Sequence, residues 1–472
     1  MKKKSTSQSA FLNLRVLLGL VLALAGVFLA LLGFGAFSKA SAQANPTPDP
    51  QQFGDTTVFR ALHSDLSRPL REQPLAWPPA EAEHEANLNP QIPHQHQDGP
   101  DPVIQSFWQR TIGLPAIPTP LLTWNGIAYP GVSCSCAPPD PDGEVGKTQY
   151  LQMVNEGIQV FDKLTGTSQL GPIAISSIWS GFGGACQTGG NGDPIVVYDQ
   201  LADRWVISQF ATPSGSTVPR DECIAISQTG DATGAWYRYD FHLTSNFLDY
   251  PKLGVWPDGY YMSANIFNTT GTSFLGPQAF VFDRVKMLTG DPTATSQTTG
   301  ITGGSTEAAF LPGDLDGIIP PAVGDPNHYV SFPQSSPLIY KVRAYHVDFT
   351  NPANSTFTLE ASVSAASFTS LCSTTRNCVP QLGTTSRLDA IGDRLMFRNA
   401  YRRFSDGHES LLNNYTVSAN AVAGVRWFEL QRTQPGSWAI FQQSTYQPDT
   451  TWRWMGSIAA DKIGRASCRE RV

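Results

Sequence analysis

The chain has 472 residues, a formal net charge of −7 and only 15% charged residues, whereas it contains 41 glycines and 36 prolines. This mild acidity argues against binding to nucleic acid or to an anionic membrane surface. Low charge combined with many turn formers is typical of an extracellular all-β protein.

The N-terminus has the pattern of a secretory signal peptide of bacterial type. A basic start precedes a long apolar run from Val16 to Phe37 and the small residues Ala40-Ser41-Ala42. We predict that residues 1–42 are a signal peptide cleaved after Ala42. The alternative is an uncleaved membrane anchor, because the apolar run is long enough to span a bilayer. In both cases the rest of the chain is secreted or lies in the cell envelope, and only this segment contacts the membrane.

Residues 43–130 have a different composition from the rest of the chain. They are rich in proline, glutamine, alanine and acidic residues, as in NPTPDPQQ and LAWPPAEAEHEANLNP. Such a composition buries little apolar surface, so it predicts a Pro-rich, largely extended linker.

The stretch from Asp193 to Leu243 predicts four short strands joined by turns. Two of these are apolar runs and two alternate between apolar and polar residues, and clusters of turn formers separate them. Four consecutive antiparallel strands in about fifty residues form one blade of a β-propeller.

The turn before the fourth of these strands resembles the Asp-box of sialidase-like propellers. Thr229, Asp231, Gly234 and Trp236 match the motif Ser/Thr-x-Asp-x-x-Gly-x-Thr-Trp, but one residue is missing before the tryptophan. In that family the box shapes the turn between the third and fourth strands of a blade. The resemblance therefore implies a structural turn and no catalytic role.

An apolar strand, a Gly/Asp turn and an alternating strand recur six times along the chain. The copies are Gly143–Asn155, Asp193–Ser208, Asp249–Asn265, Pro321–Phe332, Arg387–Asn399 and Arg453–Lys462. Their spacing is roughly 55 to 70 residues, somewhat longer than the period of about 40–50 in common propellers. We predict an all-β protein whose residues 131–462 form a propeller of four-stranded blades, six visible and seven in a complete chain. One or two β-sandwiches are the alternative.

The propeller repeat extends over roughly Pro138–Asp461, as shown by the sequences GDPIVVYD, RWVISQF, DYPKLGVWPDGYYM and WMGSIA. In this organisation the chain resembles uncharacterised large secreted bacterial propeller proteins, which mostly lack an assigned activity. The resemblance implies a fold and an extracytoplasmic location, but it transfers no active-site residues.

The C-terminal residues 463–472, IGRASCRERV, resemble the translation of a sequencing adapter. We expect these residues to be non-native and the propeller to be truncated near Lys462.

Without Cys468, six cysteines remain, an even number suited to an oxidising compartment. We predict a disulfide between Cys372 and Cys378, which flank a short loop, and another between Cys186 and Cys223 of the second unit. Cys134 and Cys136 could form a local bridge or stay free. Buried thiols are the alternative for some of these cysteines.

In a propeller, the starts of the inner strands converge around one mouth of the central channel. The candidate binding residues at this mouth are Asp140, Asp193, Asp249, Asp316 and Asp389, together with Arg387 and Arg453. Carboxylates and arginines could bind a polar sugar, and two carboxylates could cleave a glycosidic bond. The alternative is that these aspartates only cap and turn the backbone.

Two closely spaced pairs of aspartates precede a glycine, Asp140 with Asp142 and Asp314 with Asp316. Such carboxylates could hold Ca²⁺, although the later acidic ligands of an EF-hand are missing and plain turns are the alternative. We expect no other cofactor.

Known catalytic signatures are missing from the sequence. It contains neither Gly-x-Ser-x-Gly nor His-Glu-x-x-His, and Pro141 stands where the first glycine of a phosphate loop ending in Gly146-Lys147-Thr148 should be. We therefore predict a monomeric, non-catalytic binding module for a glycan or an extracellular protein. The alternative is a glycan-active enzyme, a sialidase-like glycoside hydrolase or a lyase, with its site at the channel mouth.

Overall fold

The computed structural model describes residues 50–73, 92, 100–105, 120–128, 138–303, 307–372, 375–461, 464 and 466–471. The predicted signal peptide or anchor (residues 1–42) and the pair Cys134 and Cys136 lie outside these residues. Among the helices of the described ranges, none combines the length and the apolar character needed to cross a membrane.

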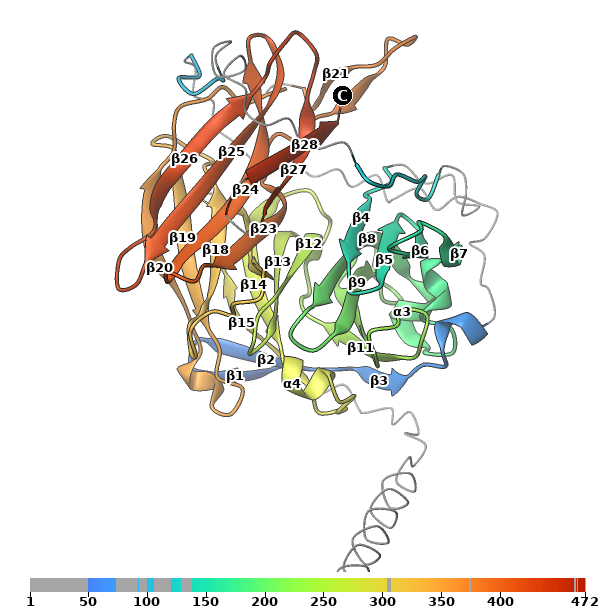
Figure 1. The fold of residues 1–472 in the computed structure, drawn as a ribbon. Helices are drawn as coiled ribbons and strands as arrows, with labels where there is room; N and C mark the ends of the chain where they lie inside the picture. The colour runs from blue at the N-terminus through green and yellow to red at the C-terminus, as the bar shows by residue number, and fades with distance from the viewer. Residues whose placement is uncertain are drawn as a thin grey trace, which may run out of the picture. The chain divides into compact units, whose positions relative to one another are not determined.

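The fold is an all-β propeller, as predicted, built of successive small sheets in which nearly all neighbouring strands are antiparallel (Figure 1). Blade 1 consists of β4 (Asp142–Val145), β5 (Gln149–Val154), β6 (Gly157–Asp162) and β7 (Ser168–Ala174). Blade 2 consists of β8 (Gly190–Asp199), β9 (Arg204–Ala211), β10 (Asp221–Ser227) and β11 (Trp236–His242). Blade 3 consists of β12 (Phe247–Val255), β13 (Tyr260–Phe267), β14 (Phe274–Phe282) and β15 (Thr295–Ile301).

Blades 4 and 5 share an interrupted inner strand. Blade 4 consists of β16 (Ala308–Leu311), β18 (Asn327–Phe332), β19 (Ile339–His346) and β20 (Thr356–Ser364). Blade 5 consists of β17 (Gly313–Asp316), β23 (Met396–Arg403), β24 (His408–Ala419), β25 (Val422–Thr433) and β26 (Ala439–Tyr446). Pro312 separates β16 from β17, and since proline has no N–H to donate, a single ladder cannot continue through it. Beyond it, β17 pairs in parallel with β23 of the next blade.

The remaining elements are small. The sixth repeat contributes β27 (Trp454–Ala460), which pairs with β28 (Ala466–Arg471), and a hairpin joins β21 (Asn377–Pro380) to β22 (Arg387–Asp389). The helical elements are η1 (Leu70–Glu72), η2 (Ile175–Ser177), α3 (Gly184–Thr188), α4 (Arg284–Met287) and η4 (Pro352–Asn354). The pairing of β28 does not test the origin of residues 463–472, which stays a prediction.

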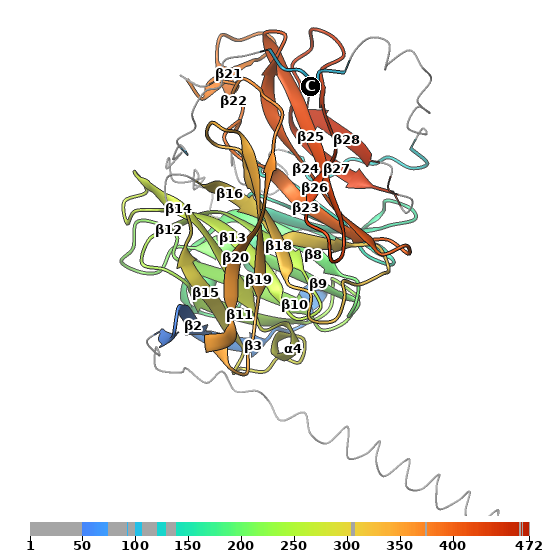
Figure 2. The same ribbon diagram turned by 90° about the vertical axis from the view of Figure 1, so that its left-hand side faces the viewer.

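The hydrophobic core lies in layers between neighbouring blades, whose ribbons are seen from a second direction in Figure 2. Val196 of β8 packs in the layer between blades 1 and 2, whereas its neighbours Ile195 and Val197 pack between blades 2 and 3. Both faces of such a sheet are buried, which explains why the inner strands read as continuous apolar runs rather than alternating ones.

Five repeats carry a residue with a left-handed backbone near the start of their first strand, and a sixth such residue, Ile391, lies before β23 and not at the inner strand β17. These residues are Asp140, Asp193, Tyr250, Ala309, Ile391 and Met455, with φ values of 33°, 46°, 56°, 45°, 43° and 47°. Only glycine adopts this region without strain, so its recurrence at five corresponding positions marks the repeat in the backbone itself.

Polar side chains of the preceding repeat hold several of these strained positions. The N–H of Asp193 donates to Asn155 Oδ1 at 3.0 Å, and the N–H of Ala309 donates to Asn265 Oδ1 at 3.2 Å. Asn155 and Asn265 end their own repeats in the sequence. The repeats are therefore joined by hydrogen bonds from the end of one unit to the start of the next.

The described parts of the segment 43–130 are docked on the propeller. Strands β1 (Gln51–Phe53) and β2 (Thr56–Arg60) extend blade 3 beyond β15, and β3 (His63–Leu66) pairs with β11 of blade 2 (Figure 1). Further on, Asp101 lies 2.7 Å from Arg426 of blade 5, and the N–H of Ile127 donates to Gln152 of blade 1 at 2.9 Å. The short strands in this segment could not be recognised from its proline-rich composition.

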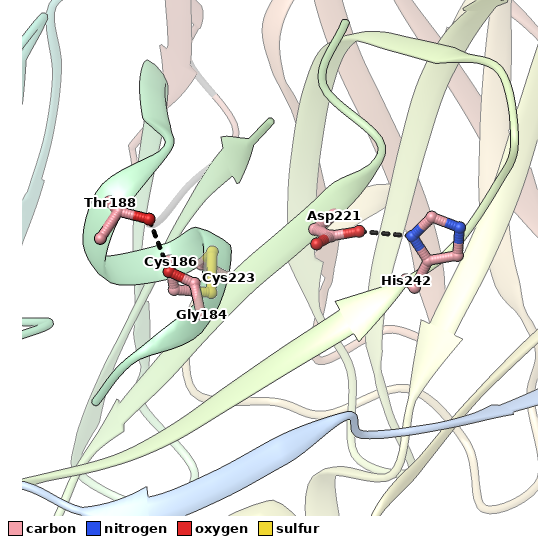
Figure 3. The surroundings of a disulfide bond; sticks show 6 residues. All are labelled: Gly184, Cys186, Thr188, Asp221, Cys223 and His242. Carbon is pink, nitrogen blue, oxygen red and sulfur yellow. Dashed lines mark hydrogen bonds and ion pairs between the residues drawn. A yellow bond between two sulfur atoms is a disulfide. The ribbon is translucent and has the colours of Figure 1, made fainter. Parts of the chain in front are cut away.

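Both predicted disulfides are present. Cys186 of α3 bonds to Cys223 of β10, with a Cα–Cα distance of 5.7 Å (Figure 3). Cys372 bonds to Cys378 of β21, six residues further along the chain. Two disulfides fit a protein of an oxidising compartment.

Candidate functional site

Several predicted residues gather where the inner strands of blades 1 to 3 begin. The partly buried ring of Tyr250 lies close to Asp140 and Asp193. Desolvation raises the pKa of its hydroxyl, Arg394 opposes this rise, and the charges of Asp193 and Asp140 add to it. Arg394 lies 4.9 Å from the centre of that ring and 3.4 Å from Asp249 Oδ2. We call Asp140, Asp193, Asp249, Tyr250 and Arg394 the mouth cluster.

Three other predicted residues have partners outside the mouth cluster. Asp389 pairs with Arg376 at 2.7 Å and accepts the N–H of Ile391 at 2.8 Å, so it caps the turn after β22. Arg387 is exposed and donates to the carbonyl of Cys378 at 3.2 Å. Arg453 binds both carboxylate oxygens of Asp449, at 2.7 and 2.9 Å.

Asp316 lies at the end of β17, not at a strand start as the sequence suggested, because Pro312 splits the inner strand of this repeat. There Arg398 of β23 pairs with Asp316, and its Nε lies 3.0 Å from Asp314 Oδ2. A third carboxylate, Glu144 of β4, lies 3.5 Å from Arg398 Nη1. We call these four residues the Arg398 cluster.

The members of the Arg398 cluster differ in their access to solvent. The side chains of Glu144, Asp316 and Arg398 are 21%, 20% and 19% exposed, whereas that of Asp314 is 4% exposed. Burial raises the pKa of Asp314 to about 7, although Arg398 opposes this shift. A ligand could therefore reach one guanidinium and two carboxylates, with a buried acid beneath them.

Strand β4 places a second acid on the same face as Glu144. Asp142 and Glu144 are two residues apart, and side chains at that spacing share one face of a strand. Burial raises the pKa of Asp142 to about 6, although the N–H of Val196 donates to its Oδ2 at 2.8 Å and favours the charged form. The charge of Glu144 adds to the upward shift.

Lys252 of β12 provides a second cation beside the mouth cluster. It is 8% exposed, and its Nζ lies 4.1 Å from the centre of the Tyr250 ring. Its charge acts on three acids, Asp142, Glu222 and Asp249, and partly offsets the rise in their pKa values. In the sequence, Lys252 and Arg398 look like ordinary members of alternating repeats, so neither was predicted as a site residue.

The four predicted calcium ligands already have partners within the protein. Asp140 accepts a hydrogen bond from Asn155 at 2.9 Å, and Asp142 bonds to the backbone. Asp314 and Asp316 already neutralise Arg398. Calcium binding at these residues stays a prediction, and at the second pair it would require Arg398 to give up its contacts.

The turn that resembles an Asp-box joins β10 to β11, the third and fourth strands of blade 2. Asp231 Oδ1 accepts the N–H of Thr233 at 3.0 Å and the side-chain amide of Gln149 of blade 1 at 2.9 Å. Trp236 is fully buried. The residues of this turn therefore shape the backbone and hold blade 2 to blade 1.

Comparisons with known proteins assign this chain to no family. No family model matches it, and no curated protein matches it. Among solved structures, it is similar to an exo-β-1,3-galactanase from Clostridium thermocellum, with 9% identity, a TM-score of 0.33 and coverage of 70% of this chain and 72% of that one.

Two arabinan-degrading enzymes show a comparable similarity. The endo-arabinase of Bacteroides thetaiotaomicron has 12% identity and a TM-score of 0.30, over 59% of this chain and 88% of that one. The α-L-arabinanase of Penicillium chrysogenum has 10% identity and a TM-score of 0.32, over 70% and 92%. At this level the similarity carries no argument about the site or the activity.

Proposed function

We propose that this protein is a glycan-active enzyme, a glycoside hydrolase whose reaction takes place between β4 and the Arg398 cluster. One observation carries the proposal: a single strand face presents Asp142, an acid whose pKa is raised to about 6, beside Glu144, which pairs with Arg398. Glycoside hydrolysis needs one carboxyl group that gives a proton and a second that acts as a base or nucleophile.

The residues then have distinct roles. Asp142 protonates the departing oxygen of the glycosidic bond, since a group with a pKa near neutrality is suited to general acid catalysis. Glu144 acts as the carboxylate partner, and Arg398 orients it and the substrate hydroxyls. The neighbouring Asp316 is the second carboxylate within reach of a bound sugar.

The proposal includes a secreted or cell-envelope location, a glycan as the partner and a monomeric state. The two disulfides support an oxidising compartment. The alternative that the experiment must exclude is the non-catalytic binding module predicted from the sequence.

The test is to incubate the protein with a panel of polysaccharides and to look for new oligosaccharides by mass spectrometry. On the substrate that is cleaved, Asp142→Asn and Glu144→Gln should each lower kcat/KM by about 10²–10⁴-fold, the usual contribution of a general acid or base. Glu72→Gln, an exposed glutamate of η1, is the matched control and should keep full activity.

Circular dichroism and thermal unfolding of each variant separate catalysis from folding. Lost activity in variants that unfold at the wild-type temperature supports the proposed roles. Retention of a polysaccharide without any product would instead establish a binding module.

A further inference from the structure

A polar pocket of about 490 Å³ lies at the seam between blades 1 and 2. Its walls come from three parts of the chain: Arg71 after β3, Lys147 and Thr148 in the turn after β4, and Asp203 and Asp231 in two turns of blade 2. It shares no residue with the Arg398 cluster. Its volume falls within the range of about 300–1,000 Å³ that is usual for small-molecule sites.

The charges around this seam pocket neutralise one another. Lys147 Nζ lies 2.8 Å from Asp203 Oδ2, and Arg71 Nη1 lies 3.0 Å from Asp231 Oδ2. All four side chains are at least 37% exposed, so their polar atoms can reach a ligand. The pocket thus offers both donors and acceptors and carries little net charge.

The floor of the seam pocket is fixed by hydrogen bonds. The Gln149 side chain is buried, donates to Asp231 Oδ1 at 2.9 Å and to Gln169 Oε1 at 2.7 Å, and accepts the N–H of Ala232 at 2.8 Å. Gly230 keeps the wall open, because a Cβ at this position would lie 2.6 Å from Asp203 Oδ1. The polar groups are therefore arranged before any ligand arrives, which lowers the cost of binding.

We propose that the seam pocket is a binding site for a neutral saccharide. Sugar hydroxyls both donate and accept hydrogen bonds, so they match a wall of paired carboxylates, cations and amides. A charged ligand would have to break one of the two ion pairs. An apolar ligand would leave the polar groups unsatisfied, which costs binding free energy. This site goes beyond the proposed catalytic function and does not depend on it.

The test measures binding of glucose, galactose, xylose and arabinose to the full chain by saturation-transfer NMR and titration calorimetry. We expect at least one of these sugars to bind. Thr148→Leu, which fills the pocket with a bulkier apolar side chain, should weaken this binding about tenfold or more. Thr350→Leu, at an exposed threonine in the loop after β19, is the matched control and should bind as the wild type does.

Glu144→Gln separates this site from the catalytic one, because it alters the Arg398 cluster and leaves the seam pocket intact. It should keep the Thr148-dependent binding even where activity is lost. Absence of sugar binding, or wild-type binding by Thr148→Leu, would overturn the proposal. Displacement of the sugar by inorganic phosphate would also overturn it, since the pocket would then be an anion site.

Discussion

Glu222 of β10 is a residue whose environment opposes its charge. It is fully buried, and burial raises its pKa to about 8, although Ser208 and Lys252 oppose the shift. The folded protein therefore holds a proton on Glu222 that the unfolded chain releases above its ordinary pKa of 4.5. Proton linkage then makes this residue's contribution to stability fall as the pH rises from about 4.5 to about 8, and level off above that.

We predict that Glu222→Gln is more stable than the wild type at pH 8.5, by an amount on the order of a few kcal/mol, because the amide has no charge to desolvate. At pH 4.5 the two proteins should differ little. The free energy of unfolding from urea titrations across this pH range checks the prediction. Glu72→Gln, at an exposed site, should keep the wild-type pH dependence, and an identical profile for Glu222→Gln would refute the buried-acid argument.

At the scale of the element, the two disulfides close loops of very different length inside the same fold. Cys186 and Cys223 are 37 residues apart, whereas Cys372 and Cys378 are 6 apart. A disulfide stabilises mainly by restricting the unfolded chain, and the effect grows with loop length.

Replacing both Cys186 and Cys223 by alanine should therefore destabilise the protein more than the same change at Cys372 and Cys378, by about 1.5 kcal/mol from loop closure alone. The loss of buried sulfur at the first pair adds to this difference. Denaturant midpoints of the two double variants give the comparison, and an equal loss would show that loop closure is not the main term.

The blades and both disulfides could be predicted because each depends on residues close together in one repeat. The Arg398 cluster could not, since Glu144 and Arg398 come from the first and fifth blades and meet only when the sheets pack together. The pairing of β17 with blade 5 could not be predicted for a related reason. Pro312 signals a break in a strand, but only the packed structure shows which neighbour takes up the strand beyond it.

At the scale of the whole molecule, the described N-terminal strands cover sheet edges that would otherwise be open. Strand β3 pairs with the outer strand of blade 2, and β2 pairs with that of blade 3. Uncovered edges offer unpaired N–H and C=O groups to other chains, so this cover also protects the propeller from aggregation. Composition alone predicted only an extended linker, because proline and polar residues dominate the average of the segment.

Asp65 tests whether this docking contributes to stability. Its carboxylate binds Arg238 of β11 through two hydrogen bonds of 2.7 and 2.6 Å, and the arginine side chain is only 3% exposed. Removing one partner of a buried pair leaves the other charge without compensation, so Asp65→Ala should lower the free energy of unfolding by about 3 kcal/mol. Asp55→Ala, at an exposed aspartate of the same segment, should change it by less than about 0.5 kcal/mol. If the segment only tethered the propeller, neither substitution would change the free energy of unfolding. If β3 is docked, only Asp65→Ala should lower it.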